Sequence, residues 1–187
     1  MDTIASVVAT VATILGASLT ASNLGARITG YGFIAFTIGS IAWFTLGTLT
    51  GQPALVYTNI AMTALNLFGV WRWLGRQAKV EEGAHAASEA SARSSGEALF
   101  PASLLTSARV RCGDTEVGTC VDAMAGCRSG RVEYVVVSEG GVAGVGETLR
   151  RLDWKDARIE GDEMVVALGA ERFAALETVS RDEWPGR

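Results

Sequence analysis

The chain has 187 residues, enough for one or two domains, and a net charge of −4. Residues 100–187 carry eleven basic and fifteen acidic side chains, and such an acidic segment without a basic stripe argues against a nucleic-acid partner. No basic region precedes the first apolar stretch and a second apolar stretch follows at once, so we expect no secretory signal peptide.

The first 71 residues are almost free of charge. Residues 3–26 contain no charged side chain, and neither do residues 28–71. A transmembrane helix needs about 20 apolar residues, so the first stretch predicts one helix and the second, of 44 residues, predicts two. Gly47, Gly51, Gln52 and Pro53 mark the break between those two, because proline suits the first turn of a new helix. We therefore predict a three-transmembrane-helix domain over residues 1–76, with helices at about 3–23, 29–49 and 53–74.

Basic residues beside these helices indicate their orientation. Arg27 lies between the first two helices, and Arg72, Arg76 and Lys79 follow the third, whereas the remaining loop has no charge. Basic loops stay in the cytoplasm. We therefore expect a multi-pass protein of the bacterial inner (cytoplasmic) membrane, with the N-terminus outside and the C-terminal domain in the cytoplasm. The aromatic residues expected at the two interfaces are Trp43, Tyr57, Trp71 and Trp73.

Each predicted span carries small or polar residues three and four positions apart, which places them on one helix face. These faces are Thr13, Gly16, Thr20 and Asn23 on the first, Ser40, Trp43 and Gly47 on the second, and Asn59, Thr63 and Asn66 on the third. Three such faces can converge on one interior.

Two interpretations of these faces remain open. In one they are packing seams, where small residues allow close approach and Asn or Thr side chains hydrogen-bond between helices. In the other they line a solute pathway, whose candidate residues are Trp43, Asn59, Asn66, Ser40 and Asn23. Neither long apolar stretch contains Asp, Glu, His, Lys or Arg, which argues against a proton relay or a charged substrate.

The second and third spans resemble a known family. Trp43, Gly47, Pro53 and Asn59, with the flanking "IGSIAW" and "NIAMTALNLFGVWRWL", resemble the SemiSWEET and PQ-loop family of three-helix membrane proteins. The resemblance implies a dimer of three-helix units around a small-sugar pathway, with Trp43 and Asn59 in the pocket. The Pro-Gln pair of that family is absent from the first span, which reads "GASLTASN".

Residues 77–98, "QAKVEEGAHAASEASARSSGEA", have the composition of a linker. They are rich in Ala, Ser, Glu and Gly and have no large apolar residue beyond Val80, so they cannot bury a core of their own. We expect the first part to prolong the third helix and the "SARSSG" part to be flexible. The single histidine, His85, lies here and is expected to be solvated.

Residues 99–187 predict a small soluble β domain. The runs "SARVRC", "EVGTCVDAM", "RVEYVVVS", "ETLRRLDW" and "EMVVALG" are short, Val-rich and partly alternating, and turn signals separate them. Five or six short strands predict a small barrel or rolled sheet. A short closing helix follows at "AERFAALE", with Phe173 and Leu176 on one face. The predicted fold class is thus a membrane α domain followed by a soluble β domain.

The order of these runs resembles the PRC-barrel. The matching residues are Gly118, Val121 and Asp122 in "EVGTCVDAM", the strand "GRVEYVVV", and "LDW" ending at Trp154, where Asp153 stands in place of the family's proline. The resemblance implies a docking or regulatory module without catalytic residues. It implies a protein partner bound through the barrel.

We find no pattern that predicts catalysis. Cys112, Cys120 and Cys127 lack the close paired spacing of a zinc site, so neither a metal nor another cofactor is expected. The glycine-rich "GGVAGVGE" joins two predicted strands, whereas loops that bind phosphate open a helix. With the sole histidine in the linker, no Ser-His-Asp or Cys-His arrangement can form. We expect a protein that is not an enzyme.

Two functions are compatible with these features. In the first, the helices fix a PRC-barrel-like docking scaffold to the cytoplasmic membrane face, where it binds a protein partner. In the second, the chain is a SemiSWEET-like transporter or sensor of a small neutral solute, with the barrel as regulator. The second function requires a homo-oligomer, because one three-helix unit encloses too little space for a pathway. The first is preferred, because the barrel resemblance is stronger than the resemblance of the helices and the Pro-Gln pair is missing.

Overall fold

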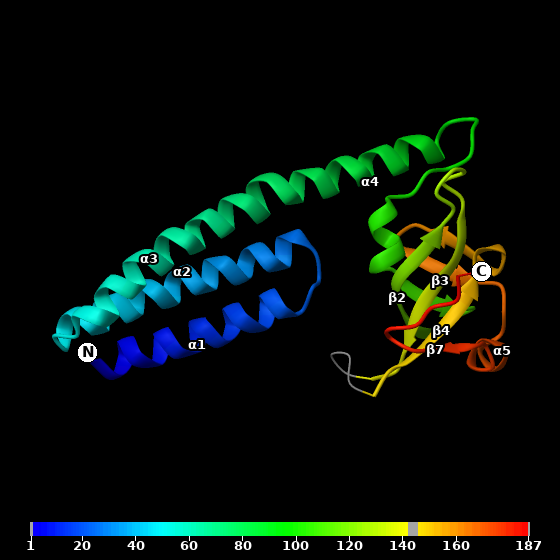
Figure 1. Cartoon of the computed structure of the whole chain (residues 1–187). Coiled ribbons are helices and arrows are strands. Elements are labelled where there is room, and N and C mark those ends of the chain that lie inside the picture. Colours follow the sequence, from blue (N-terminus) through cyan, green and yellow to red (C-terminus); the bar gives the residue numbers. More distant parts are fainter. Residues whose placement is uncertain (1, 142–145, 187) are drawn as a thin grey trace. The chain divides into compact units, whose positions relative to one another are not determined.

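The computed structural model describes residues 2–141 and 146–186 of the chain. It divides the chain into two compact units, Met1–Ala87 and Ser88–Arg187, and this division lies inside the predicted linker (Figure 1). The first unit is helical and the second is built around a β-sheet. The predicted "GGVAGVGE" hairpin has its central residues, 142–145, outside the described part of the chain.

The helical unit contains the three predicted long helices. They are α1 (Asp2–Ala21), α2 (Ala26–Leu49) and α3 (Pro53–Val70), and all three are long and apolar enough to cross a membrane. Pro53 begins α3, as predicted, because its missing N–H is unused at the first turn of a helix. The helix then continues through a π-helical segment, η1 (Trp71–Gln77), into α4 (Ala78–Ala92), so the start of the linker does prolong the third helix.

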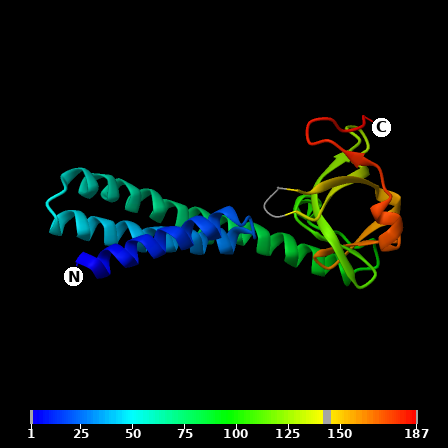
Figure 2. The ribbon, with the colours of Figure 1, turned by 90° about the horizontal axis from the view of Figure 1, so that it is seen from below.

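Helix α2 packs against both α1 and α3, whereas α1 and α3 have hardly any contact with each other in the described residues (Figures 1 and 2). Glycines bring α1 and α2 together. A Cβ atom placed on Gly32 would lie 3.0 Å from the carbonyl oxygen of Gly16, and one on Gly39 would lie 3.0 Å from the Thr13 hydroxyl. The backbones are thus too close for larger side chains, which is the packing expected of small residues between apolar helices.

The second unit is a seven-stranded sheet with the order β5-β6-β1-β2-β3-β4-β7. The neighbouring pairs are antiparallel except β1–β6, which is parallel. The strands are β1 (Arg109–Cys112), β2 (Thr115–Ala125), β3 (Val132–Glu139), β4 (Thr148–Asp153), β5 (Ala157–Glu160), β6 (Glu163–Val166) and β7 (Thr178–Val179).

The sheet is curled but not closed. Its edges, β5 and β7, do not pair with each other among the described residues, so the predicted closure into a barrel is not seen. Both edges are short, four and two residues, and both lie outside the runs that predicted strands. The predicted closing helix is present as α5 (Ala170–Ala174), and its Phe173 is fully buried.

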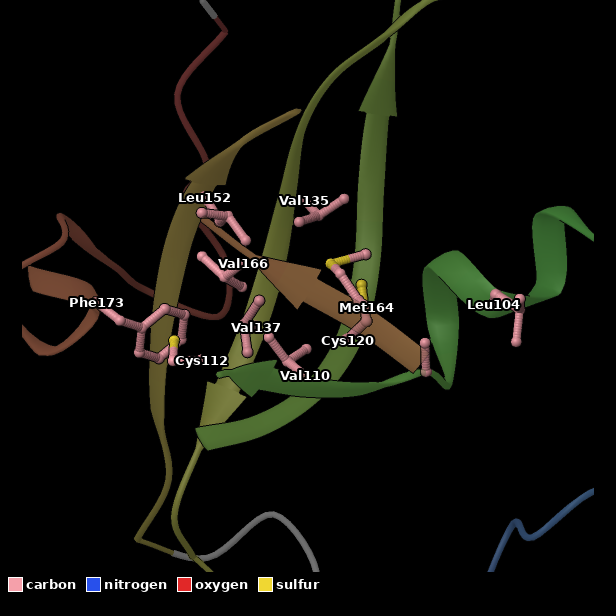
Figure 3. Close-up of a cluster of buried hydrophobic side chains, with 11 residues drawn as sticks. Leu104, Val110, Cys112, Cys120, Val135, Val137, Leu152, Met164, Val166 and Phe173 are labelled. Atoms are coloured by element: carbon pink, nitrogen blue, oxygen red, sulfur yellow. The ribbon is translucent and has the colours of Figure 1, made fainter. Parts of the chain in front are cut away.

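The concave side of the sheet holds the main core (Figure 3). Side chains from β1, β2, β3, β4 and β6 and from α5 point toward one another there. The buried members are Leu104, Ala108, Val110, Cys112, Cys120, Val135, Val137, Leu152, Met164, Val166 and Phe173. Burial of this apolar surface is the main force that stabilises the unit.

A smaller apolar cluster covers the opposite face of β3. Tyr134 and Val136 are buried against Leu149, with Val179 and Trp184 packed over them. The Tyr134 hydroxyl donates a hydrogen bond of 2.7 Å to the carbonyl oxygen of Pro185. Strand β3 is therefore covered on both faces, which explains why "YVVV" is continuously apolar rather than alternating.

Candidate functional site

The polar residues of α2 and α3 meet in a seam between the two helices. The Thr63 hydroxyl of α3 lies 2.9 Å from the Ser40 hydroxyl of α2 and donates to the carbonyl oxygen of Asn59 at 2.7 Å. The Asn59 amide nitrogen donates to the carbonyl oxygen of Leu55 at 2.8 Å. Ser40 and Asn59 are 5% and 7% exposed. We call Ser40, Asn59, Thr63 and Asn66 the polar seam.

Asn66 differs from the rest of the polar seam. Asn66 is 5% exposed, yet its side chain forms no hydrogen bond with any residue that the structure describes. An amide has two donor hydrogens and an acceptor oxygen. The Asn66 amide nitrogen and oxygen are not among the fully buried, unpaired polar atoms of the described residues, so they reach the molecular surface. Asn66 therefore carries unused hydrogen-bonding capacity that a neighbouring molecule can reach.

The other two predicted site residues lie outside this network. Trp43 is on α2, one turn beyond Ser40 and half-buried. Asn23 is exposed in the loop between α1 and α2, where its φ of 51° is left-handed. The structure thus brings Ser40, Asn59 and Asn66 to one interface, and it leaves Asn23 at the end of the helices.

The three polar faces do not converge on one interior. Thr13 and Gly16 of α1 pack against glycines of α2, while Asn59 and Thr63 of α3 pack against another part of α2. The sequence left such convergence open, because helical periodicity predicts which residues share a face but not which neighbour that face contacts. Two separate seams result.

A second polar arrangement, which the sequence analysis missed, lies where α2 begins. The backbone N–H of Ala26 points between the two Glu81 carboxylate oxygens, each 3.2 Å away, and Arg27 forms an ion pair with Glu82. Gly25, with φ 93°, precedes α2 and has no side chain to cap it. A carboxylate stabilises the N-terminus of a helix, so Glu81 acts as a cap supplied from 55 residues away. We call Ala26, Arg27, Glu81 and Glu82 the clasp.

The clasp connects α4 to the start of α2, next to the loop between α1 and α2. Ala78, one turn before Glu81, is 6% exposed, and a Cβ atom on Gly30 of α2 would lie 2.4 Å from Leu74 of η1. Two features of the sequence could have revealed the clasp. The helix that starts at Ala26, beside Arg27, has no capping side chain before it, and Glu81 and Glu82 are the nearest carboxylates on the same predicted side of the membrane.

The cysteines of the sheet unit have separate environments. Cys112 and Cys120 are buried and Cys127 is exposed. Burial raises the pKa of the Cys120 thiol to about 12, and the thiol donates to the carbonyl oxygen of Leu105 at 2.9 Å. At neutral pH it is therefore a protonated, inert thiol rather than a nucleophile. Among residues 2–141 and 146–186, no three His, Cys, Asp or Glu side chains lie together as a metal site would require.

The chain matches no model of a protein family, and it has no match among curated proteins. Its function is therefore inferred from its residues and their geometry.

Proposed function

We propose that this protein is a non-enzymatic membrane anchor that presents a docking module on the cytoplasmic face of a bacterial inner membrane. Its three long helices cross the bilayer, and its curled sheet, which we assign to the PRC-barrel class, binds a protein partner. The observation that carries the proposal is the uninterrupted helical run from Pro53 to Ala92. It leads from an apolar segment into a charged one without a break, so one continuous helix passes from lipid into water.

The charge distribution supports the orientation. Arg27, Arg72, Arg76 and Lys79 lie at one end of the helices, and the turn at 50–52 at the other end has no charge. The end with the basic residues faces the cytoplasm under the positive-inside rule. The N-terminus is then outside and the sheet unit inside.

Co-purification tests the docking role. The full chain is isolated from its native membrane, and the partner that is retained is identified and quantified. Phe173→Ala disturbs the core of the sheet and is expected to abolish retention, while Trp43→Ala and Asn59→Ala alter only the helices and leave it intact. Equal loss from all three variants would contradict a module that acts through its sheet.

Asn66 favours a second candidate function, a dimeric transporter or sensor of a small neutral solute. The unused donors and acceptor of its amide suit the hydroxyl groups of such a solute. Trp43 and Asn59 are the further candidates for the pocket, and a second copy of the chain would complete it. Proteoliposomes that take up labelled neutral sugars, with uptake lost on Asn66→Leu, would establish this function.

A further inference from the structure

Three cations follow α3 without a carboxylate partner. Arg72 and Arg76 lie in η1 and Lys79 lies in the first turn of α4, so they are four and three residues apart along one continuous helix. All three side chains are exposed, and none forms an ion pair within the described part of the chain. Over about 10 Å of helix length, three positive charges are therefore left uncompensated.

The carboxylates nearest to these three cations along the chain, Glu81 and Glu82, already have other partners. Glu81 caps the backbone N–H of Ala26, and Glu82 pairs with Arg27. The clasp thus draws both acidic side chains to the start of α2 and leaves Arg72, Arg76 and Lys79 as an unneutralised basic surface.

An exposed tryptophan lies within the same segment. Trp71 is 54% exposed, its ring is 5.7 Å from the Arg76 guanidinium carbon, and it also contacts Phe68 with 5.5 Å between ring centroids. Tryptophan concentrates at the level of lipid headgroups, where its ring meets the apolar chains and its N–H meets polar groups. A tryptophan in contact with Arg76, on the helical segment that also carries Arg72 and Lys79, is therefore suited to the headgroup level of a bilayer.

We propose that Trp71, Arg72, Arg76 and Lys79 form a binding strip for the phosphate headgroups of anionic phospholipids. The inference rests on the proposed function, because it requires α3 to lie in a bilayer. Arginine binds phosphate oxygens through two parallel N–H donors, and lysine adds a point charge. Each such residue near an anionic surface strengthens binding about fivefold. The strip holds the start of α4 at the membrane surface.

The test uses the full chain in detergent with equimolar phosphatidylglycerol and phosphatidylcholine, and native mass spectrometry counts the bound lipids. We expect at least about tenfold preference for phosphatidylglycerol, loss of that preference in R72Q/R76Q/K79Q, and weakening with added salt. The matched control, R128Q/R131Q/R172Q, removes three exposed cations of the sheet unit that also lack ion pairs, and it is expected to keep the preference. No preference in the wild type, or an equal loss in the control, would overturn the proposal.

A flotation assay distinguishes failure of the lipid-binding strip from failure of the proposed membrane anchor. Each protein is incorporated into vesicles of pure phosphatidylcholine, washed with alkaline carbonate and floated on a density gradient. All three are expected to float, with equal helical circular dichroism. A wild type that floats without preferring phosphatidylglycerol contradicts the strip alone, whereas a wild type that does not float contradicts the membrane anchor.

Discussion

Replacement of Asn66 by leucine tests whether the polar seam serves packing alone. Asn66 is 5% exposed as a residue, and its side chain forms no hydrogen bond with a described residue, so its replacement breaks no polar contact within the described part of the chain. Leucine has a similar volume and no polar atoms. If the helices only anchor the protein, Asn66→Leu should therefore leave the helical unit as stable as the wild type or stabilise it by up to about 1 kcal/mol, less than the cost of a fully buried unpaired amide.

The matched control is Asn59→Leu. Asn59 donates to the Leu55 carbonyl oxygen one turn earlier in the same helix, and a hydrogen bond of this kind contributes about 1 kcal/mol. Its loss roughly offsets the benefit of removing a polar group, so we expect little change. Unfolding by SDS in mixed micelles, followed by far-UV circular dichroism, measures both variants. Destabilisation by Asn66→Leu of more than about 1 kcal/mol would refute the reasoning, because the amide would then have a partner in a second copy or a solute.

Three further substitutions probe the packing of the two units. Phe173→Ala should destabilise the sheet unit by about 3–5 kcal/mol in guanidinium unfolding, because the Phe173 side chain is fully buried. The control Val121→Ala should cost less than about 1 kcal/mol, because Val121 is 39% exposed. Similar losses of stability in the two variants would exclude α5 from the core. Gly32→Leu should destabilise the helical unit by about 1–3 kcal/mol in SDS unfolding, because the larger side chain pushes α1 away from α2. The control Gly83→Leu should cost nothing, because the space around Gly83 is open. Unchanged stability in Gly32→Leu would contradict the close approach of α1 and α2. Glu81→Gln should speed amide hydrogen exchange in the first turn of α2 several-fold, since a carboxylate there contributes about 0.3–1 kcal/mol, and exchange that matches the wild type would deny it a capping role.

The long elements of this protein could be predicted from sequence because their signals are local. The uncharged runs have the lengths of one and two membrane spans, and Pro53 marks the break within the longer run. These two signals predict α1, α2 and α3. Short Val-rich runs between turns lead to five of the seven strands, and Phe173 indicates α5. Strands β5 and β7 are too short to show an alternating pattern.

Long-range contacts account for what the sequence did not reveal. The hydrogen bond from Ala26 to Glu81 joins residues 55 positions apart, and composition alone placed Glu81 in the linker, in the part expected to prolong the third helix. The residues of the polar seam were predicted correctly as one helix face each, but the neighbour that each face meets depends on how α2 sits between α1 and α3. The parallel pairing of β1 with β6, which sets the strand order, likewise depends on residues more than 50 positions apart.

The side of the membrane that holds the sheet unit can be measured with its own cysteines. Cys127 is exposed, whereas Cys112 and Cys120 are buried and have pKa values raised by burial, so a membrane-impermeant maleimide reacts at neutral pH with Cys127. If the sheet unit lies in the cytoplasm, Cys127 stays unlabelled in intact cells and is labelled in inside-out vesicles. Gln52→Cys in a Cys127→Ser background, in the turn before α3, should show the reverse. Labelling of Cys127 in intact cells would contradict the proposed cytoplasmic docking module.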